Sequence, residues 1–177
     1  MKKKLWIPLI AAVVLLSGLW LWYARPMTLE ELNPGVELGQ CVKIVAYQGE
    51  GGPWEIRKDV ELLPGDPAFE SLMELLEGRT FRRCLWKNLL VNSPIGAGSI
   101  HVSEEGAFRW DLSLYFEEIP LSNGEVIQNG VFYLQNIYGE LLLINGLTGD
   151  PYIKTSDQKQ WSSEVRSLIL QGSEAAA

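Results

Sequence analysis

The chain opens with three lysines, Lys2–Lys4, followed by an unbroken run of apolar residues over positions 5–23. As a helix, this run is about 28 Å long at ~1.5 Å per residue, close to the roughly 30 Å hydrocarbon thickness of a bilayer. It therefore predicts a basic tail at residues 1–4 and a transmembrane helix at residues 5–23. Aromatic rings that suit the two membrane interfaces occur at both ends of the run, namely Trp6, Trp20, Trp22 and Tyr23.

The distribution of basic residues predicts the orientation of this helix. Lys2–Lys4 precede the apolar run and only Arg25 follows it closely, so we expect a cytoplasmic N-terminus and an extracytoplasmic C-terminal part at the cell membrane. The alternative is a cleaved secretory signal, which usually has a shorter apolar region and ends in small residues. A cut after Ala24 would put the bulky Trp22 at the third position before the cut. The sequence thus favours an intact, single-pass signal anchor.

After the apolar run, the sequence predicts one domain. Residues 24–35 read as a short linker, because Asn33-Pro34-Gly35 is a turn signal. Residues 36–172 follow as an extracytoplasmic domain of ordinary size, and residues 173–177 as a disordered tail.

Alternation of apolar and polar residues, the period of a half-buried strand, recurs along this domain. In the first such segment we expect Val42, Ile44 and Ala46 on one face and Cys41 on the other. The segments that predict strands are 36–47, 54–62, 80–90, 100–103, 107–116, 131–135, 141–145 and a short edge at 152–154.

The alternation is strongest over residues 107–116. It places Asp111, Ser113 and Tyr115 opposite the apolar side chains, so this second face is expected to contact water. Further along, Asn129-Gly130 is the dipeptide typical of a tight type I′ hairpin.

Two segments have helical spacing instead. Asp66 is the expected N-cap of a helix that has Pro67 in its first turn and ends at Gly78. Thr155 and Gln158 resemble the capping box of a last helix, which is expected to end at Gly172. The fold class predicted is α+β, a mainly antiparallel sheet packed by two helices after the membrane helix.

Charge and cysteine content narrow the function classes. Without the three N-terminal lysines, twelve basic residues remain against 22 acidic ones, a net charge of −10 that disfavours nucleic acid and anionic surfaces as partners. The two cysteines, Cys41 and Cys84, would form a disulfide in an oxidising compartment if the fold brings them together. The alternative is two buried thiols, because neither cysteine belongs to a CxxC or metal-binding pattern.

Residues with catalytic chemistry are sparse. His101 is the only histidine, and with Ser103 and Asp111 it lacks a nucleophile elbow. The acidic pairs Glu104-Glu105 and Glu117-Glu118 read as solvated strand ends. We therefore predict no catalytic residue, no metal site and no cofactor.

The most distinctive surface feature is a set of arginines next to tryptophans. These residue types are the usual anchors of protein interfaces, although the same side chains also cover sheets and fill cores. The predicted interaction surface comprises Arg82, Arg83, Trp86 and Arg109.

In the order of its parts, the chain resembles small single-pass extracytoplasmic proteins of Gram-positive bacteria. The resemblance rests on the basic start and apolar run, the helix at Pro67–Glu77, the Arg82-Arg83 strand and the terminal meander. It is architectural and implies no activity and no site. The function expected is a membrane-anchored binding or accessory domain with a membrane or envelope protein as partner. The alternative is an envelope hydrolase that uses carboxylates such as Glu105 and Glu118.

Overall fold

The computed structural model describes residues 6–50, 58–91, 108–121, 123–137, 140–144 and 152–175. These residues form a mixed helix and antiparallel sheet structure, which confirms the α+β class. The elements are α1 (Trp6–Tyr23), α2 (Leu29–Leu32), the 3-10 helix η2 (Leu38–Gln40), β1 (Cys41–Glu50), β2 (Lys58–Leu62), α3 (Pro67–Glu77), β3 (Phe81–Arg83), α4 (Leu85–Val91), β4 (Phe108–Pro120), β5 (Val126–Ile137), β6 (Glu140–Ile144), β7 (Tyr152–Thr155) and α5 (Gln158–Ala175).

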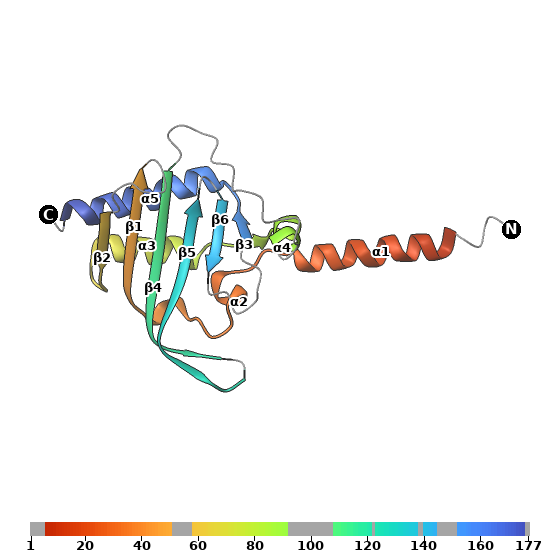
Figure 1. Cartoon of the computed structure of the whole chain (residues 1–177), viewed down its shortest axis with the longest axis horizontal. Helices are drawn as coiled ribbons and strands as arrows, with labels where there is room; N and C mark the ends of the chain where they lie inside the picture. Colours follow the sequence, from red (N-terminus) through yellow and green to blue (C-terminus); the bar gives the residue numbers. More distant parts are fainter. Residues whose placement is uncertain are drawn as a thin grey trace.

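The seven described strands form one sheet in the order β2-β1-β4-β5-β6-β7-β3, and every neighbouring pair is antiparallel. The short strand predicted at 152–154 is present as β7, but it lies inside the sheet, because β3 pairs with its outer side. In Figure 1, α1 extends from the β3 end of this sheet, along the long axis of the molecule. Within the sheet, β3 is therefore the strand nearest to α1, and β2 is the strand furthest from it.

Helices α3 and α5 cover one face of the sheet, as the two amphipathic patterns predicted (Figure 1). The core between the layers contains an aromatic cluster in which the Trp161 ring packs edge-on against Phe81, with centroids 5.7 Å apart, and against Trp110, at 5.6 Å. The Trp110 indole donates to the Ser162 hydroxyl of α5 over 2.8 Å. Because these three rings come from β3, β4 and α5, they join the sheet and the helix layer into one core.

The face of β4 away from the helices differs from the prediction. Asp111 and Ser113 were expected to contact water, yet they are only 5% and 2% exposed. Both are small, and in the sheet register Ser113 lies between Val45 and Tyr133 on the neighbouring strands. Side chains on adjacent strands approach within about 5 Å, so larger neighbours cover the smaller residues between them.

The first strand also shows a change of phase. The β1–β4 register shifts between Cys41 and Lys43, and as a result Cys41 is buried whereas Val42 is 40% exposed. A regular alternation predicted the reverse for these two residues. The extra residue of a bulge exchanges the faces of the residues before it, while Ile44 and Ala46 stay in the core as expected.

The strand predicted over 80–90 is wrong beyond its first residues. Only β3 is extended, and the chain then forms the helix α4. Asn88 accounts for the change, because its side chain binds both the N–H and the C=O of Tyr152. The Tyr152 carbonyl also accepts the Cys84 N–H, so the Asn88 side chain replaces the backbone of a longer β3 at the Tyr152 N–H.

Asn129-Gly130 does not form a hairpin but lies within β5, where Gly130 pairs with Phe116. The turn between β4 and β5 is formed earlier, where the Leu121 N–H donates to the Glu125 carbonyl over 2.7 Å. A Cβ on Gly130 would lie 2.4 Å from the Cδ1 atom of Ile119, so glycine here makes room for a buried side chain. The Asn-Gly signal therefore reflects packing and a positive φ of 53° at Asn129.

The last helix begins and ends differently from the prediction. Thr155 belongs to β7, and its hydroxyl donates to the Thr80 carbonyl, so the capping box with Gln158 does not form. The helix continues through Gly172 to Ala175, inside the segment expected to be disordered. Gly172 is buried, and a Cβ there would lie 2.7 Å from a methyl carbon of Leu62. This glycine allows α5 to approach β2 closely.

Residues 27–35, which were expected to be linker, pack into the core instead. Met27 forms a two-way β-bridge with Phe81, with N···O distances of 2.9 and 2.7 Å. The short helix α2 follows, with a capping box between Thr28 and Glu31, and it buries Leu29 and Leu32. The folded part therefore begins at Met27, and three residues separate it from α1.

Candidate functional site

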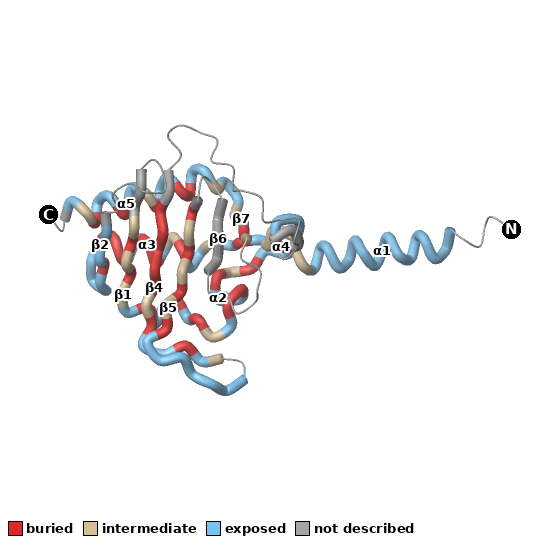
Figure 2. Tube along the Cα trace, viewed as in Figure 1, coloured by how far each residue is buried: buried red, intermediate tan, exposed pale blue. Residues whose placement is uncertain are grey.

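The candidate site lies where α1 meets the domain. Helix α1 is apolar on all sides, and every large apolar side chain from Trp6 to Trp22 is at least 53% exposed (Figure 2). Among the described residues, this helix is the one segment long and apolar enough to cross a membrane. Its C-terminal end, by contrast, contacts β3 and α4, and α4 in turn binds β7.

Asn88 of α4 is the centre of this contact. Its side-chain amide donates to the hydroxyl of Tyr23, the last residue of α1, over 3.1 Å. The same amide donates to the Tyr152 carbonyl at 3.1 Å, and its oxygen accepts the Tyr152 N–H at 2.9 Å. Asn88 is only 2% exposed, so one buried side chain connects the apolar helix to a strand of the sheet.

Two cation–π contacts add to this junction. The Arg83 guanidinium carbon lies 5.7 Å from the centroid of the Tyr23 ring, and Arg25 lies 5.8 Å from that of Trp22. An arginine over an aromatic ring is attracted by the negative face of the ring. The Arg83 contact and the nearby Met27 bridge hold the end of α1 against the edge strand of the sheet, whereas the Arg25 contact is local to the end of α1.

The predicted interaction surface is only partly a single surface. Arg82 and Arg83 lie on β3, and Trp86 follows on α4, where it is 67% exposed. Arg109 lies on β4, four strand positions away, which corresponds to about 19 Å at ~4.8 Å per strand. The structure therefore brings the first three residues together next to α1 and separates Arg109 from them.

Two further basic residues occur at the same end, and sequence reasoning missed both. Lys154 on β7 is directly opposite Arg82 in the strand register, and Lys87 follows Trp86 on α4. Arg82, Lys87 and Lys154 are all exposed. The pairing of β7 with β3 was the missing information, since it joins residues more than seventy positions apart.

The predicted membrane-interface residues occupy both ends of α1. Trp6 begins the helix, Trp20 and Trp22 lie in its last turns, and all three are more than half exposed. Tyr23 is half-buried because it faces Asn88. This tyrosine therefore belongs to the contact with the domain.

Of the two possibilities for the cysteines, the structure has the unpaired one, because Cys41 and Cys84 are both free thiols. Cys41 begins β1, whereas Cys84 follows β3 and donates its backbone N–H to Tyr152. Five strand positions separate β1 from β3, about 24 Å at ~4.8 Å each, whereas a disulfide needs Cα atoms within roughly 7 Å. Burial raises the pKa of the Cys41 thiol, whose sulfur donates to the Lys43 carbonyl.

The carboxylates considered for acid and base chemistry gain no support. Glu117 and Glu118 are exposed on the outer part of β4, and Glu118 accepts a hydrogen bond from Gln128 over 2.9 Å. His101, Ser103 and Glu104-Glu105 lie outside the described residues, and Asp111 is buried in the sheet. Among the described residues, no three His, Cys, Asp or Glu side chains gather as a metal site would require.

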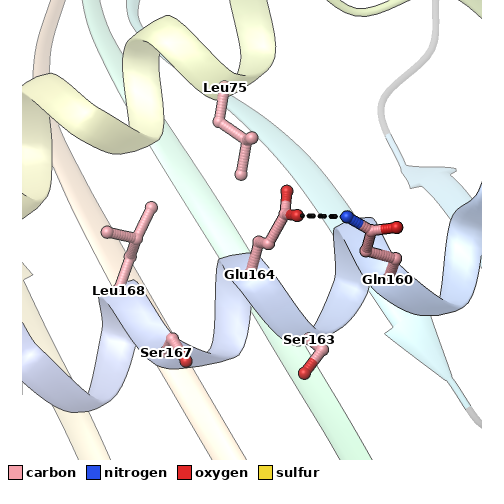
Figure 3. A pocket seen from close by; sticks show the side chains of 6 residues that line it. All are labelled: Leu75, Gln160, Ser163, Glu164, Ser167 and Leu168. Carbon is pink, nitrogen blue, oxygen red and sulfur yellow. Dashed lines mark hydrogen bonds between the residues drawn. The ribbon is translucent and has the colours of Figure 1, made fainter.

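A groove of about 340 Å³ lies between α3 and α5 (Figure 3). Leu75 of α3 faces α5 across it, and the floor and rim on α5 are lined by Gln160, Ser163, Glu164, Ser167 and Leu168. Gln160 donates to the Glu164 carboxylate over 3.0 Å. The groove contains one carboxylate and no second ionisable group, so its lining does not provide an acid and base pair.

Comparison with known proteins adds no family or function. No protein-family model, no curated protein and no solved structure matches this chain.

Proposed function

We propose that the chain is a single-pass membrane protein with a cytoplasmic N-terminus, whose extracytoplasmic α+β domain is a binding or accessory module and not an enzyme. The observation that carries the membrane part is the exposure of α1. A helix that is apolar all round is stable only when it is surrounded by a protein core or by lipid. The described domain contacts Tyr23 at the end of α1 and leaves the large apolar side chains before it exposed. At about 27 Å, its length also suits a bilayer.

The junction supports an anchor that stays attached. The cleavage point considered above follows Ala24, yet residues on both sides of it contribute to the folded domain. Tyr23 binds Asn88, and Met27 pairs with Phe81. Removal of the apolar run would also remove these contacts of Tyr23.

The short connection sets where the domain lies. With three residues between α1 and the Met27 bridge, the domain sits next to the membrane, and β3 and α4 are its nearest elements. The strands β4 and β5 run across the direction of α1 and project beyond the rest of the sheet (Figure 1). On this arm Val126 and Ile127 are 47% and 40% exposed and lie on opposite faces of β5, so each face of the arm offers an apolar side chain to a protein in the same membrane or envelope.

The orientation can be tested in intact cells by cysteine accessibility. In a full-length Cys84→Ser background, Ser163→Cys on the outer face of α5 is expected to react with a membrane-impermeant maleimide without permeabilisation. Lys3→Cys is expected to react only after permeabilisation. Labelling of both positions only after permeabilisation, or release of the chain from membranes by alkaline carbonate, would contradict the proposal.

The binding role needs a separate experiment. A photo-crosslinking residue at position 126 on the arm is expected to capture one membrane or envelope protein reproducibly, whereas the same residue at position 163 is not. Equal capture from both positions would indicate random collision. Absence of capture, together with substrate turnover by the purified full-length chain, would favour the hydrolase.

A further inference from the structure

Basic residues gather at the end of the domain next to α1, although the domain as a whole is acidic. Of the twelve basic residues after the N-terminal lysines, five lie on β3, α4 or β7 or directly after α1: Arg25, Arg82, Arg83, Lys87 and Lys154. Trp86 of α4, which is 67% exposed, is next to Lys87 in this set. Net charge alone predicts repulsion from an anionic surface, but contact depends on the face that is presented to it.

One pair in this set is costly for the fold alone. Arg82 and Lys154 are direct cross-strand partners in β3 and β7, and both are exposed. Like charges in this position destabilise an antiparallel pair. The β6–β7 register, continued by one position, sets Glu140 on the other side of Lys154, so Arg82 is the member of the pair further from this carboxylate. Negative charge from outside the chain would therefore stabilise this pair further.

The position of the pair identifies that negative charge. Asn88 connects α4 to the last residue of α1, so Trp86 and Lys87 lie where the proposed membrane span ends. Tryptophan and lysine are the residues that favour the headgroup region, the first through its amphipathic ring and the second through its charge. Resting on the membrane span proposed above, we propose that Arg82, Trp86, Lys87 and Lys154 form a lipid-docking patch that binds anionic phospholipid headgroups of the adjacent leaflet.

Docking at this patch fixes the domain relative to the bilayer. β3 and α4 then lie at the headgroups, and β2, six strand positions further in the sheet, lies about 29 Å away at ~4.8 Å per strand. Only three residues connect α1 to the Met27 bridge, so the patch stays close to the end of α1.

The test uses the full chain in nanodiscs with a fluorophore beside the patch. Thr80→Cys, exposed next to β3, is labelled in a Cys84→Ser background, and quenching is measured with lipids that carry a spin label in the headgroup. Strong quenching is expected in an equal mixture of phosphatidylcholine and phosphatidylglycerol. It should be weak in phosphatidylcholine alone and at high salt, where the Debye length falls to about 3 Å.

Substitutions assign the effect to the patch. Each basic residue near an anionic surface strengthens binding about fivefold, so Lys154→Gln should lower the ratio of docked to undocked chains about fivefold, and Arg82→Gln with Lys154→Gln about 25-fold. Lys43→Gln is the matched control, because Lys43 is another sheet lysine, five strand positions from β3. It should leave the quenching unchanged.

The outcomes separate this proposal from the one it rests on. A chain that fails to incorporate into the discs contradicts the membrane span itself. Incorporation with weak quenching in both lipids, or quenching that is equal in both and insensitive to the patch substitutions, overturns the lipid-docking patch alone. If Lys43→Gln lowered the quenching as much as Lys154→Gln, the quenching would depend on the overall charge of the chain and not on the patch. This result would also overturn the proposal.

Discussion

Asn88→Ala should uncouple the apolar helix from the domain at a measurable cost in stability. The substitution removes two bonds donated by the side-chain amide and one accepted by its oxygen, and it leaves the Tyr152 N–H without this partner in a buried site. At about 1 kcal/mol net for each bond, the free energy of unfolding should fall by about 3 kcal/mol. For a chain of this size, Tm should fall by about 6–12 °C.

The assay is thermal unfolding of the full chain in detergent micelles, followed by circular dichroism. Tyr23→Phe removes only the acceptor on α1 and should cost about 1 kcal/mol, or about 2–4 °C. In a double-mutant cycle, Tyr23→Phe should cost almost nothing once Asn88 is alanine, so the coupling energy is about 1 kcal/mol. This coupling reports the direct bond between α1 and the domain.

The control is Asn123→Ala, an exposed asparagine that also makes side-chain hydrogen bonds, in the β4–β5 turn. Its replacement should change Tm by no more than about 2 °C, because water satisfies the freed groups. If Asn88→Ala matches this control, Asn88 is not the buried connector described above. If the effects of Asn88→Ala and Tyr23→Phe simply add, α1 is not bonded to α4.

Three further outcomes are expected. Gly172→Ala should destabilise the chain by about 1 kcal/mol in urea unfolding, because the added methyl group overpacks the contact with β2 by more than the better helix propensity of alanine offsets; a gain in stability would contradict this packing. Arg82→Glu should raise Tm by about 2–4 °C by placing a carboxylate opposite Lys154, while it weakens lipid docking; a fall in both would show that Arg82 is needed by the fold. Cys41 and Cys84 should both be alkylated after denaturation without reductant, and Cys41 only slowly before it, because burial raises the pKa of its thiol; a mass that shows no adducts until reduction would restore the disulfide.

Patterns of local origin were predicted well. The apolar run, the helix at Pro67–Glu77, and the strands that correspond to β4, β5 and β6 follow from side-chain period and from residues that start or stop an element. These signals depend on neighbours a few positions apart, so the sequence alone contains them. The fold class followed for the same reason.

The errors share a different cause, which is packing against residues distant in the sequence. Gly130 was predicted to lie in a turn and Gly172 to end the last helix. Both glycines instead make room for side chains of other elements. Thr155 was predicted to cap the last helix, but it lies in β7 and its hydroxyl donates to the carbonyl of Thr80, the residue before the neighbouring strand β3. Asn88, at the centre of the junction, has no signal of its own, because an asparagine becomes a connector only when a buried backbone is placed next to it.

The sequence by itself determined that this chain has one segment suited to a bilayer and an acidic α+β domain after it. Only the tertiary structure decided where the charge lies. By pairing β7 with β3, it sets Lys154 beside Arg82 and gathers basic residues at the end next to α1. Net charge is a sum over the whole chain, whereas a membrane meets a single face, and strand pairing across more than seventy residues determines which face that is.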